Sequence, residues 1–181
     1  TLTCSDSAQV AVANQASQVQ PAYHLIAVRP LTADAWHSLV ERSECDIISL
    51  ALDEKLPTQL RKKDVDVFLK RGVFFEVEFA PALRDTGKRR SVLANLAQLL
   101  HATRGKNVFL SSAAVDPMEM RSPHDLANFA AVIGLRGTLG LESVSDAPYR
   151  ALQRGALRRG CLQVIPRPLA NPPDEGSKDV D

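Results

Sequence analysis

A dense group of basic residues precedes one of the apolar repeats of this chain. The segment Arg84–Arg90 reads Arg-Asp-Thr-Gly-Lys-Arg-Arg, and apolar residues follow at Val92, Leu96 and Leu99. Their spacing predicts a helix, so the basic residues fall at its N-terminus. Free N–H groups and the helix dipole make that end positive, so cations there are unfavourable unless an anion is bound. We interpret these cations as candidate polyanion contacts; they are Arg84, Lys88, Arg89 and Arg90.

The same segment has a second interpretation in which its charges are neutralised inside the fold. Asp85 is placed to be the N-cap of the helix rather than an acid catalyst. Carboxylates such as Asp85 or Glu76 can pair with the arginines, Arg84 first, since it is nearest the strand end. Aromatic residues make up only 5% of the chain, so phosphate contact is favoured over base stacking in either case.

Catalytic groups are sparse elsewhere. Glu76 and Glu78 share one face of a predicted strand and could form a carboxylate pair, although a Glu bonded to an Arg inside a barrel explains Glu76 equally well. The four histidines show no H-x-H or H-E-x-x-H spacing. The chain also has no G-x-S-x-G, no phosphate loop and no G-x-G-x-x-G.

The elements that must position these groups alternate between strand and helix patterns. Short apolar runs predict strands at Tyr23–Val28, Asp46–Leu50, Val73–Phe79 and Asn107–Ser112, with weaker ones at Leu2–Cys4 and Leu162–Ile165. Helix starts are indicated by Thr32 as an N-cap, by Pro57, and by Ser122-Pro123. Repeated strand–helix units predict a parallel α/β fold, either an open sheet or most of a barrel.

In such folds the working residues collect after the strands, at their C-terminal ends. We therefore expect a set of structural polar residues at the strand ends: Arg29, Glu76, Asp85, Ser112, Arg121 and Asp125. A second basic block lies later in the chain, because residues 146–170 hold five arginines and one acid. Its candidate contacts are Arg154, Arg158 and Arg159.

The overall composition excludes several classes of protein. Apolar residues make up 45% of the 181 and charged residues 24%, as in a globular domain. No run of roughly eighteen apolar residues is present, so we expect no membrane partner. Three widely spaced cysteines predict neither a disulfide framework nor a zinc ribbon. Residues 166–181, rich in Pro and acid, are expected to form a disordered acidic tail.

Several short stretches, in order and spread over residues 2–165, together resemble one family. They are Leu25–Pro30 (LIAVRP), Cys45–Leu50 (CDIISL), Lys55–Pro57, Arg71–Glu76 (RGVFFE), Ala80–Asp85 (APALRD), Arg89-Arg90, Arg104–Val108 (RGKNV), Ser111–Ala114 (SSAA) and Arg121–Asn128 (RSPHDLAN). This pattern is similar to the thirty-kilodalton-class protein subunit of ribonuclease P and ribonuclease MRP. The resemblance implies a TIM-barrel-like parallel β/α barrel of the polymerase-and-histidinol-phosphatase (PHP) type. It also implies that residues 1–165 form a partial barrel, incomplete at the N-terminus.

The resemblance further implies an accessory, non-catalytic subunit that supports 5′-end maturation of precursor tRNA. Its expected partners are the RNA component of ribonuclease P or MRP, precursor tRNA, and other protein subunits including a small ferredoxin-like one. The resemblance also implies a location in the nucleus and, within it, the nucleolus. Two alternatives stay open: a metal-dependent PHP-type phosphoesterase, and a protein-interaction scaffold without RNA contact.

The strand ending Ser112-Ala113-Ala114-Val115 generates a prediction about metal. Active phosphoesterases of the PHP type carry a strand ending similar to Ser-Asp-Ala-His, whose acid and histidine bind metal. Ala113 and Val115 stand in those positions here and offer no ligand atom. No cofactor is therefore expected, and elemental analysis of the purified protein should find no stoichiometric Mn or Zn. One bound ion per chain, lost with activity on chelation, would support the phosphoesterase instead.

Overall fold

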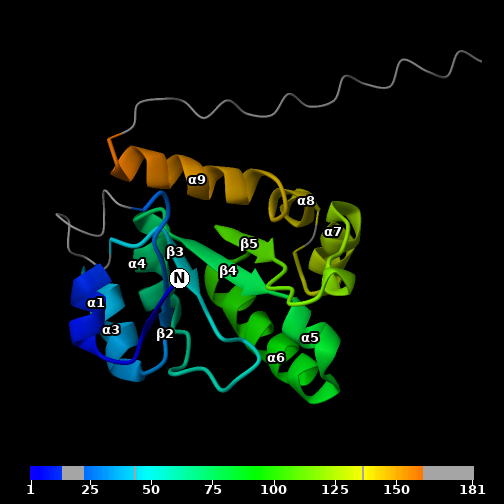
Figure 1. Cartoon of the computed structure of the whole chain (residues 1–181), viewed down its shortest axis with the longest axis horizontal. Coiled ribbons are helices and arrows are strands. Elements are labelled where there is room, and N and C mark those ends of the chain that lie inside the picture. Colours follow the sequence, from blue (N-terminus) through cyan, green and yellow to red (C-terminus); the bar gives the residue numbers. More distant parts are fainter. Residues whose placement is uncertain (14–22, 43, 136, 161–181) are drawn as a thin grey trace, which may run out of the picture.

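The structure is a computed structural model that describes residues 1–13, 23–42, 44–135 and 137–160. Within them, five parallel strands lie side by side in the order in which they occur in the sequence (Figure 1). They are β1 (Leu2–Cys4), β2 (Ala27–Pro30), β3 (Ile47–Ser49), β4 (Phe74–Glu78) and β5 (Val108–Ser111). The expected strand Leu162–Ile165 and the expected tail at residues 166–181 lie outside the described residues.

Helices alternate with these strands. They are α1 (Ser7–Ala13), α3 (Ala33–Arg42), α4 (Lys62–Lys70), α5 (Ala80–Arg84), α6 (Thr86–Thr103), the 3-10 turn η1 (Pro117–Glu119), α7 (Pro123–Val132), α8 (Thr138–Glu142) and α9 (Asp146–Arg158). None of the helices in the described part of the chain is both long and apolar enough to cross a membrane.

The main core lies between the sheet and the helices α1, α3, α4 and α6. Val28, Ile48 and Phe75 point from neighbouring strands to this face, where they join Trp36 of α3 and Leu96 of α6 in one buried cluster. A doubly wound sheet reverses its strand order and places helices on both faces. Here the order is sequential and the crossover helices share one core, which is the arrangement of a β/α barrel wall. The predicted fold class is confirmed.

Aromatic rings fix the centre of this core. Phe68 of α4 lies between Trp36 and Phe75, with ring centroids 5.3 Å and 6.0 Å apart and edge-on geometry in both pairs. All three side chains have no measurable exposure. Edge-on pairs add to the free energy gained from apolar burial alone.

The opposite face of the sheet is covered in part by α9, which runs along the top of the view in Figure 1. Ile47, Phe74 and Phe109 form a second buried cluster with Ala147 and Ala151 of α9. The next residue of this stripe is Gly155, where a Cβ atom would collide with the carbonyl oxygen of His24. Small side chains at this spacing therefore let α9 lie directly on the sheet and on the residues that lead into β2.

The anchor between α9 and the sheet is the carboxylate of Asp46, which is fully buried. It accepts a hydrogen bond from the backbone N–H of Ile26 at 2.9 Å and two from the Nε of Arg158, at 3.1 and 3.2 Å. The Nη2 of Arg158 lies 3.0 Å away, and the Nε of Arg154 lies 3.7 Å away, which is ion-pair range but too long for a hydrogen bond. One buried carboxylate thus joins β3 to two turns of α9.

This anchor also explains why β2 is shorter than the predicted strand. The sequence pattern predicts a strand from Tyr23, whereas β2 begins at Ala27. The carbonyls of Tyr23 and His24 accept hydrogen bonds from Arg158, and the N–H of Ile26 donates to Asp46. These backbone groups are taken by side chains and are not available to a neighbouring strand.

The prediction of a helix start at Pro57 is wrong. Helix α4 begins only at Lys62, after an irregular connection. Asn95 of α6 donates from its side-chain amide to the carbonyls of Leu52 and Glu54, both at 2.8 Å. These long-range bonds hold the connection in a non-helical path, which overrides a weak local preference.

Two predicted helix caps are confirmed. The hydroxyl of Thr32 accepts from the N–H of Ala35 at 3.2 Å, and that of Ser122 accepts from the N–H of Asp125 at 3.2 Å. Each satisfies a backbone donor in the first turn of its helix.

The Asp46 anchor predicts a large loss of stability on truncation. Asp46→Ala removes the carboxylate from Arg158, whose side chain is only 10% exposed, so the free energy of unfolding should fall by about 3–5 kcal/mol. Urea unfolding followed by circular dichroism measures the change. The control is Glu142→Ala, which removes a partner that lies 3.9 Å from Arg150 at the surface, and should cost under about 1 kcal/mol. Equal losses in the two variants would show that Asp46 is not the anchor.

Candidate nucleic-acid interface

The N-terminus of α6 is already occupied by an internal anion. Asp85 is the N-cap, as predicted, and its carboxylate accepts from the N–H groups of Gly87 at 2.6 Å and Lys88 at 3.4 Å. The conflict between the basic residues and the helix dipole is therefore relieved within the chain. A bound phosphate is not required to explain this helix start.

Two of the four basic residues are neutralised by carboxylates. Arg84 donates to both oxygens of Glu119, at 2.5 and 2.8 Å, and to the carbonyl of Ala113 at 2.8 Å. The Nζ of Lys88 lies 2.8 Å from Asp53. The prediction that Asp85 or Glu76 pairs with these basic residues is wrong. The turn η1 brings Glu119 to Arg84, and the connection after β3 brings Asp53 to Lys88.

The pair formed by Arg84 alters the acidity of its partner. The hydrogen bond from Arg84, followed by one from the backbone N–H of Val115, lowers the pKa of Glu119 from 4.5 to about 2. The hydrogen bond to Asp53 likewise raises the pKa of Lys88. Glu119 and Lys88 are thus held in their charged forms near neutral pH.

The remaining two cations of the segment behave differently. The Nε of Arg89 donates to the carbonyl of Ala82 at 2.8 Å, so this guanidinium is positioned but has no carboxylate bonded to it among the described residues. Arg90 is exposed, and its side chain forms no hydrogen bond or ion pair in the described ranges.

The strand ends carry a polar network on the inner face of the sheet. Arg29 donates to the hydroxyl of Ser49 at 2.8 Å and forms an ion pair with Glu78. The expected Glu–Arg pair therefore exists, but on Glu78 rather than Glu76. Strand register places Ser49 beside Glu76. The long Arg29 side chain extends past Ser49 to Glu78, which lies two residues further along β4 on the same face.

The other predicted strand-end residues serve local structure. The carbonyl of Ser112 accepts from the N–H of Ala80 at 3.1 Å, which ties β5 to α5. Arg121 donates to the carbonyls of Met118 and Met120 at 2.7 and 2.9 Å. Asp125 accepts from the Ser122 hydroxyl at 2.9 Å.

The strand ending with Ala113 and Val115 lies beside this network. Ala113 adopts a left-handed backbone, with φ at 46°, and its carbonyl is bound by Arg84. Val115 is 84% exposed. In residues 1–13, 23–42, 44–135 and 137–160, no three His, Cys, Asp or Glu side chains gather closely enough to hold a metal ion.

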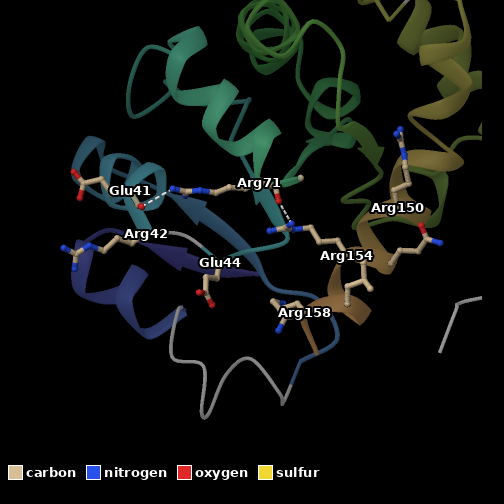
Figure 2. A pocket seen from close by; sticks show the side chains of 10 residues that line it. Glu41, Arg42, Glu44, Arg71, Arg150, Arg154 and Arg158 are labelled. Carbon is tan, nitrogen blue, oxygen red and sulfur yellow. Dashed lines mark hydrogen bonds between the residues drawn. The ribbon is translucent and has the colours of Figure 1, made fainter. Parts of the chain in front are cut away.

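A large concave surface was not predicted from the sequence. It is a pocket of about 770 Å³ at the amino-terminal ends of β3 and β4, on the side opposite to the loops where function was expected. Its lining includes five arginines, from α3, the end of α4 and α9: Arg42, Arg71, Arg150, Arg154 and Arg158. We call it the arginine pocket (Figure 2).

Most guanidinium bonds in the arginine pocket go to backbone carbonyls. Arg71 donates to the carbonyl of Glu41 at 3.1 Å, and the carboxylate of Glu41 points away from it in Figure 2. Arg154 donates to the carbonyls of Arg71 and Cys45, and its Nε is buried without a hydrogen bond. Arg154 and Arg158 share the single charge of Asp46. Arg71 and Arg154 are therefore held in place by backbone oxygens, and Arg71 has no carboxylate bonded to it among the described residues.

The arginines that α9 contributes to this pocket follow a pattern that is visible in the sequence. Arg150, Arg154 and Arg158 recur every four residues along α9 and so share one helix face. Arg154 and Arg158 were predicted contacts of this basic block together with Arg159, whose half-buried side chain forms no hydrogen bond or ion pair among the described residues. Arg71 carried no local signal, since it reaches the pocket only through the fold.

Comparisons with known proteins agree with one another. A family model described as RNase P subunit p30 matches residues 1–160. The chain is 32% identical over 183 residues to the mouse ribonuclease P protein subunit p30, covering 99% of this chain and 68% of that protein. It is 24% identical over 142 residues to the ribonuclease P/MRP protein subunit RPP1 of Saccharomyces cerevisiae, covering 78% of this chain and 48% of that protein.

A solved structure supports the fold. One chain in a cryo-EM structure of archaeal ribonuclease P with mature tRNA superimposes with a TM-score of 0.70 over 97% of this chain and 75% of that chain, at 16% sequence identity. The barrel wall seen here is thus shared with that chain.

The Arg84–Glu119 pair generates a prediction for acid conditions. Because its pKa is lowered to about 2, Glu119 stabilises the fold above its ordinary pKa of 4.5, and this contribution is lost as pH falls toward 2. In Glu119→Gln the free energy of unfolding should therefore decline less steeply than in the wild type between these two pH values. Urea unfolding at a series of pH values measures both slopes. Identical slopes would show that the pair does not form in solution.

Proposed function

Because the chain belongs to the RNase P subunit p30 family, we propose that it acts as a protein subunit of a ribonuclease P or MRP ribonucleoprotein. It supports 5′-end processing of precursor tRNA by stabilising RNA structure and by binding other protein subunits, among them a small ferredoxin-like one. Its RNA partners are the RNA component of the particle and precursor tRNA. The particle works in the nucleus, including the nucleolus.

The chain contributes no catalytic group of its own in this proposal. At the carboxyl ends of the strands, where a PHP-type phosphoesterase would hold metal, Arg29 pairs with Glu78 and Arg84 pairs with Glu119. Ala113 and Val115 supply no ligand atoms. The polar groups at this end are bound to one another, which supports a structural role for them.

The observation that carries the RNA contact is the arginine pocket. Non-specific attraction to RNA comes from phosphates that meet positioned cations. Arg71 and Arg154 are held by backbone carbonyls, so little conformational freedom is lost when a phosphate binds. In the segment Arg84–Arg90, by contrast, Asp53, Asp85 and Glu119 already bind the basic end of α6. The phosphate contact is accordingly assigned to the pocket.

Arg150 is the residue best suited to test this assignment. Its side chain is 50% exposed and lies 3.9 Å from the carboxylate of Glu142, which is too long for a hydrogen bond, so its removal should scarcely alter stability. Arg150→Gln should weaken binding about equally to a precursor tRNA and to a structured RNA of unrelated sequence. The slope of log affinity against log salt should fall by roughly one unit, since one phosphate contact is lost. Filter binding over a range of KCl concentrations measures both.

The matched control is Arg90→Gln, which removes an exposed arginine from the other basic segment. This variant should keep the wild-type affinity and salt slope. If instead Arg90→Gln lowers the slope and Arg150→Gln does not, the RNA contact lies at the N-terminus of α6 and the assignment to the pocket is wrong.

A further inference from the structure

An apolar groove lies between α5, the first turns of α6, and α7, at the carboxyl ends of β4 and β5 (Figure 1). Its volume is about 450 Å³. The floor is formed by Phe79 and Ala82, which are almost fully buried, and by the partly buried Leu126 and Phe129. This groove is on the opposite side of the strands from the arginine pocket.

The walls of the groove expose large apolar side chains to solvent. Leu83 is 40% exposed, Leu93 is 42% exposed and Val132 is 85% exposed. The neighbouring loop adds Met118 and Met120, at 81% and 63%. A contiguous apolar surface of this kind marks an interaction site more often than isolated exposed residues do.

The rim of the groove is positively charged and positioned. Arg89 and Arg121 line it, and each guanidinium is held by backbone carbonyls, of Ala82 for the first and of Met118 and Met120 for the second. Neither forms an ion pair with a carboxylate in the described residues. Asp125 is the one acid among the lining residues, and its carboxylate accepts from Ser122 at the start of α7.

We propose that this groove binds a short amphipathic helix from another protein, with apolar side chains seated between the exposed aliphatic walls and acidic side chains paired with Arg89 and Arg121. Helix-in-groove binding uses apolar anchors on one helix face, and charged residues at the rim select the partner. Arginine is well suited to this role, because its planar fork binds a carboxylate through two hydrogen bonds.

The chemistry of the groove favours protein over RNA. RNA is bound by aromatic stacking or by unobstructed cations. Here Phe79 is 3% exposed and cannot stack on a base, and the walls are aliphatic. This inference rests on the proposed function in one respect, because the partner is expected among the proteins of the ribonuclease P or MRP particle.

Two single substitutions test the groove in the assembled particle. Val132→Glu places a carboxylate on the wall, and Arg121→Glu reverses a rim charge. The tagged chain is purified from cells with its particle, and the copurifying proteins and RNA are quantified. In each variant, the amount of one particular copurified protein should fall about tenfold or more relative to the tagged chain, while the amount of copurified RNA is unchanged. A loss of this size is expected for a central interface residue.

The matched control is Val12→Glu near the C-terminal end of α1. Val12 is 48% exposed, far from the groove, and is likewise a valine close to a helix end. This variant should leave all proteins at wild-type levels. No loss of any protein in the groove variants, or an equal loss in the control, overturns the proposal.

Photo-crosslinking identifies the occupant without relying on a destabilising change. A benzophenone amino acid at Val132 should crosslink to an acidic, amphipathic segment of a different protein, and mass spectrometry identifies the joined peptides. A crosslink to RNA, to a second copy of this chain or to residues 161–181 of the chain itself contradicts the proposal. A crosslink to a protein that belongs to no ribonuclease P or MRP particle would support the groove while contradicting the proposed function.

Discussion

The arrangement of this chain depends on one buried carboxylate. Asp46 lies just before β3, has no contact with solvent, and binds the backbone of Ile26 on one side and Arg158 on the other. Without it, Arg154 and Arg158 would lose the carboxylate that they share, and α9 would keep its packed small residues and its bonds to backbone carbonyls. Because Asp46 holds Arg158, α9 covers the inner apolar face of the sheet. The same carboxylate lies in ion-pair range of Arg154 in the arginine pocket.

The two ends of the barrel wall use their charges in opposite ways. At the carboxyl ends of the strands, carboxylates bind the basic side chains directly, as Glu78 binds Arg29 and Glu119 binds Arg84. At the amino-terminal ends, carbonyl oxygens perform much of this task, so that Arg71 is fixed without being neutralised. The barrel scaffold commonly places chemistry at the carboxyl ends. Here Arg29 and Arg84 are bound in internal pairs at that end, Arg89 and Arg121 stay outside these pairs, and the opposite end presents the arginine pocket.

Local patterns in the sequence predicted the parts of the fold that depend on near neighbours. Apolar runs placed β3 and β4 to within a residue or two, and Ser122-Pro123 marked the start of α7, because strand burial and helix caps are read from a few adjacent residues. Contacts made across the fold were not predictable. Glu119 reaches Arg84 from 35 residues away, and Arg154 meets the Arg71 carbonyl from 83 residues away. Neither pairing leaves a spacing signal in the chain, so the arginine pocket could be inferred only in part, from the repeat along α9.

The packing of α9 also determines when the inner face of the sheet can be covered during synthesis. Asp46 and Arg158 are 112 residues apart, so the anchor cannot form until most of the chain has left the ribosome. At about 5–20 residues per second, Ile47 and its buried neighbours on the inner face wait several seconds for their cover. During that interval the nascent chain presents an uncovered apolar sheet face to the cytosol. The last described helix therefore sets the earliest moment at which this face of the sheet can be buried.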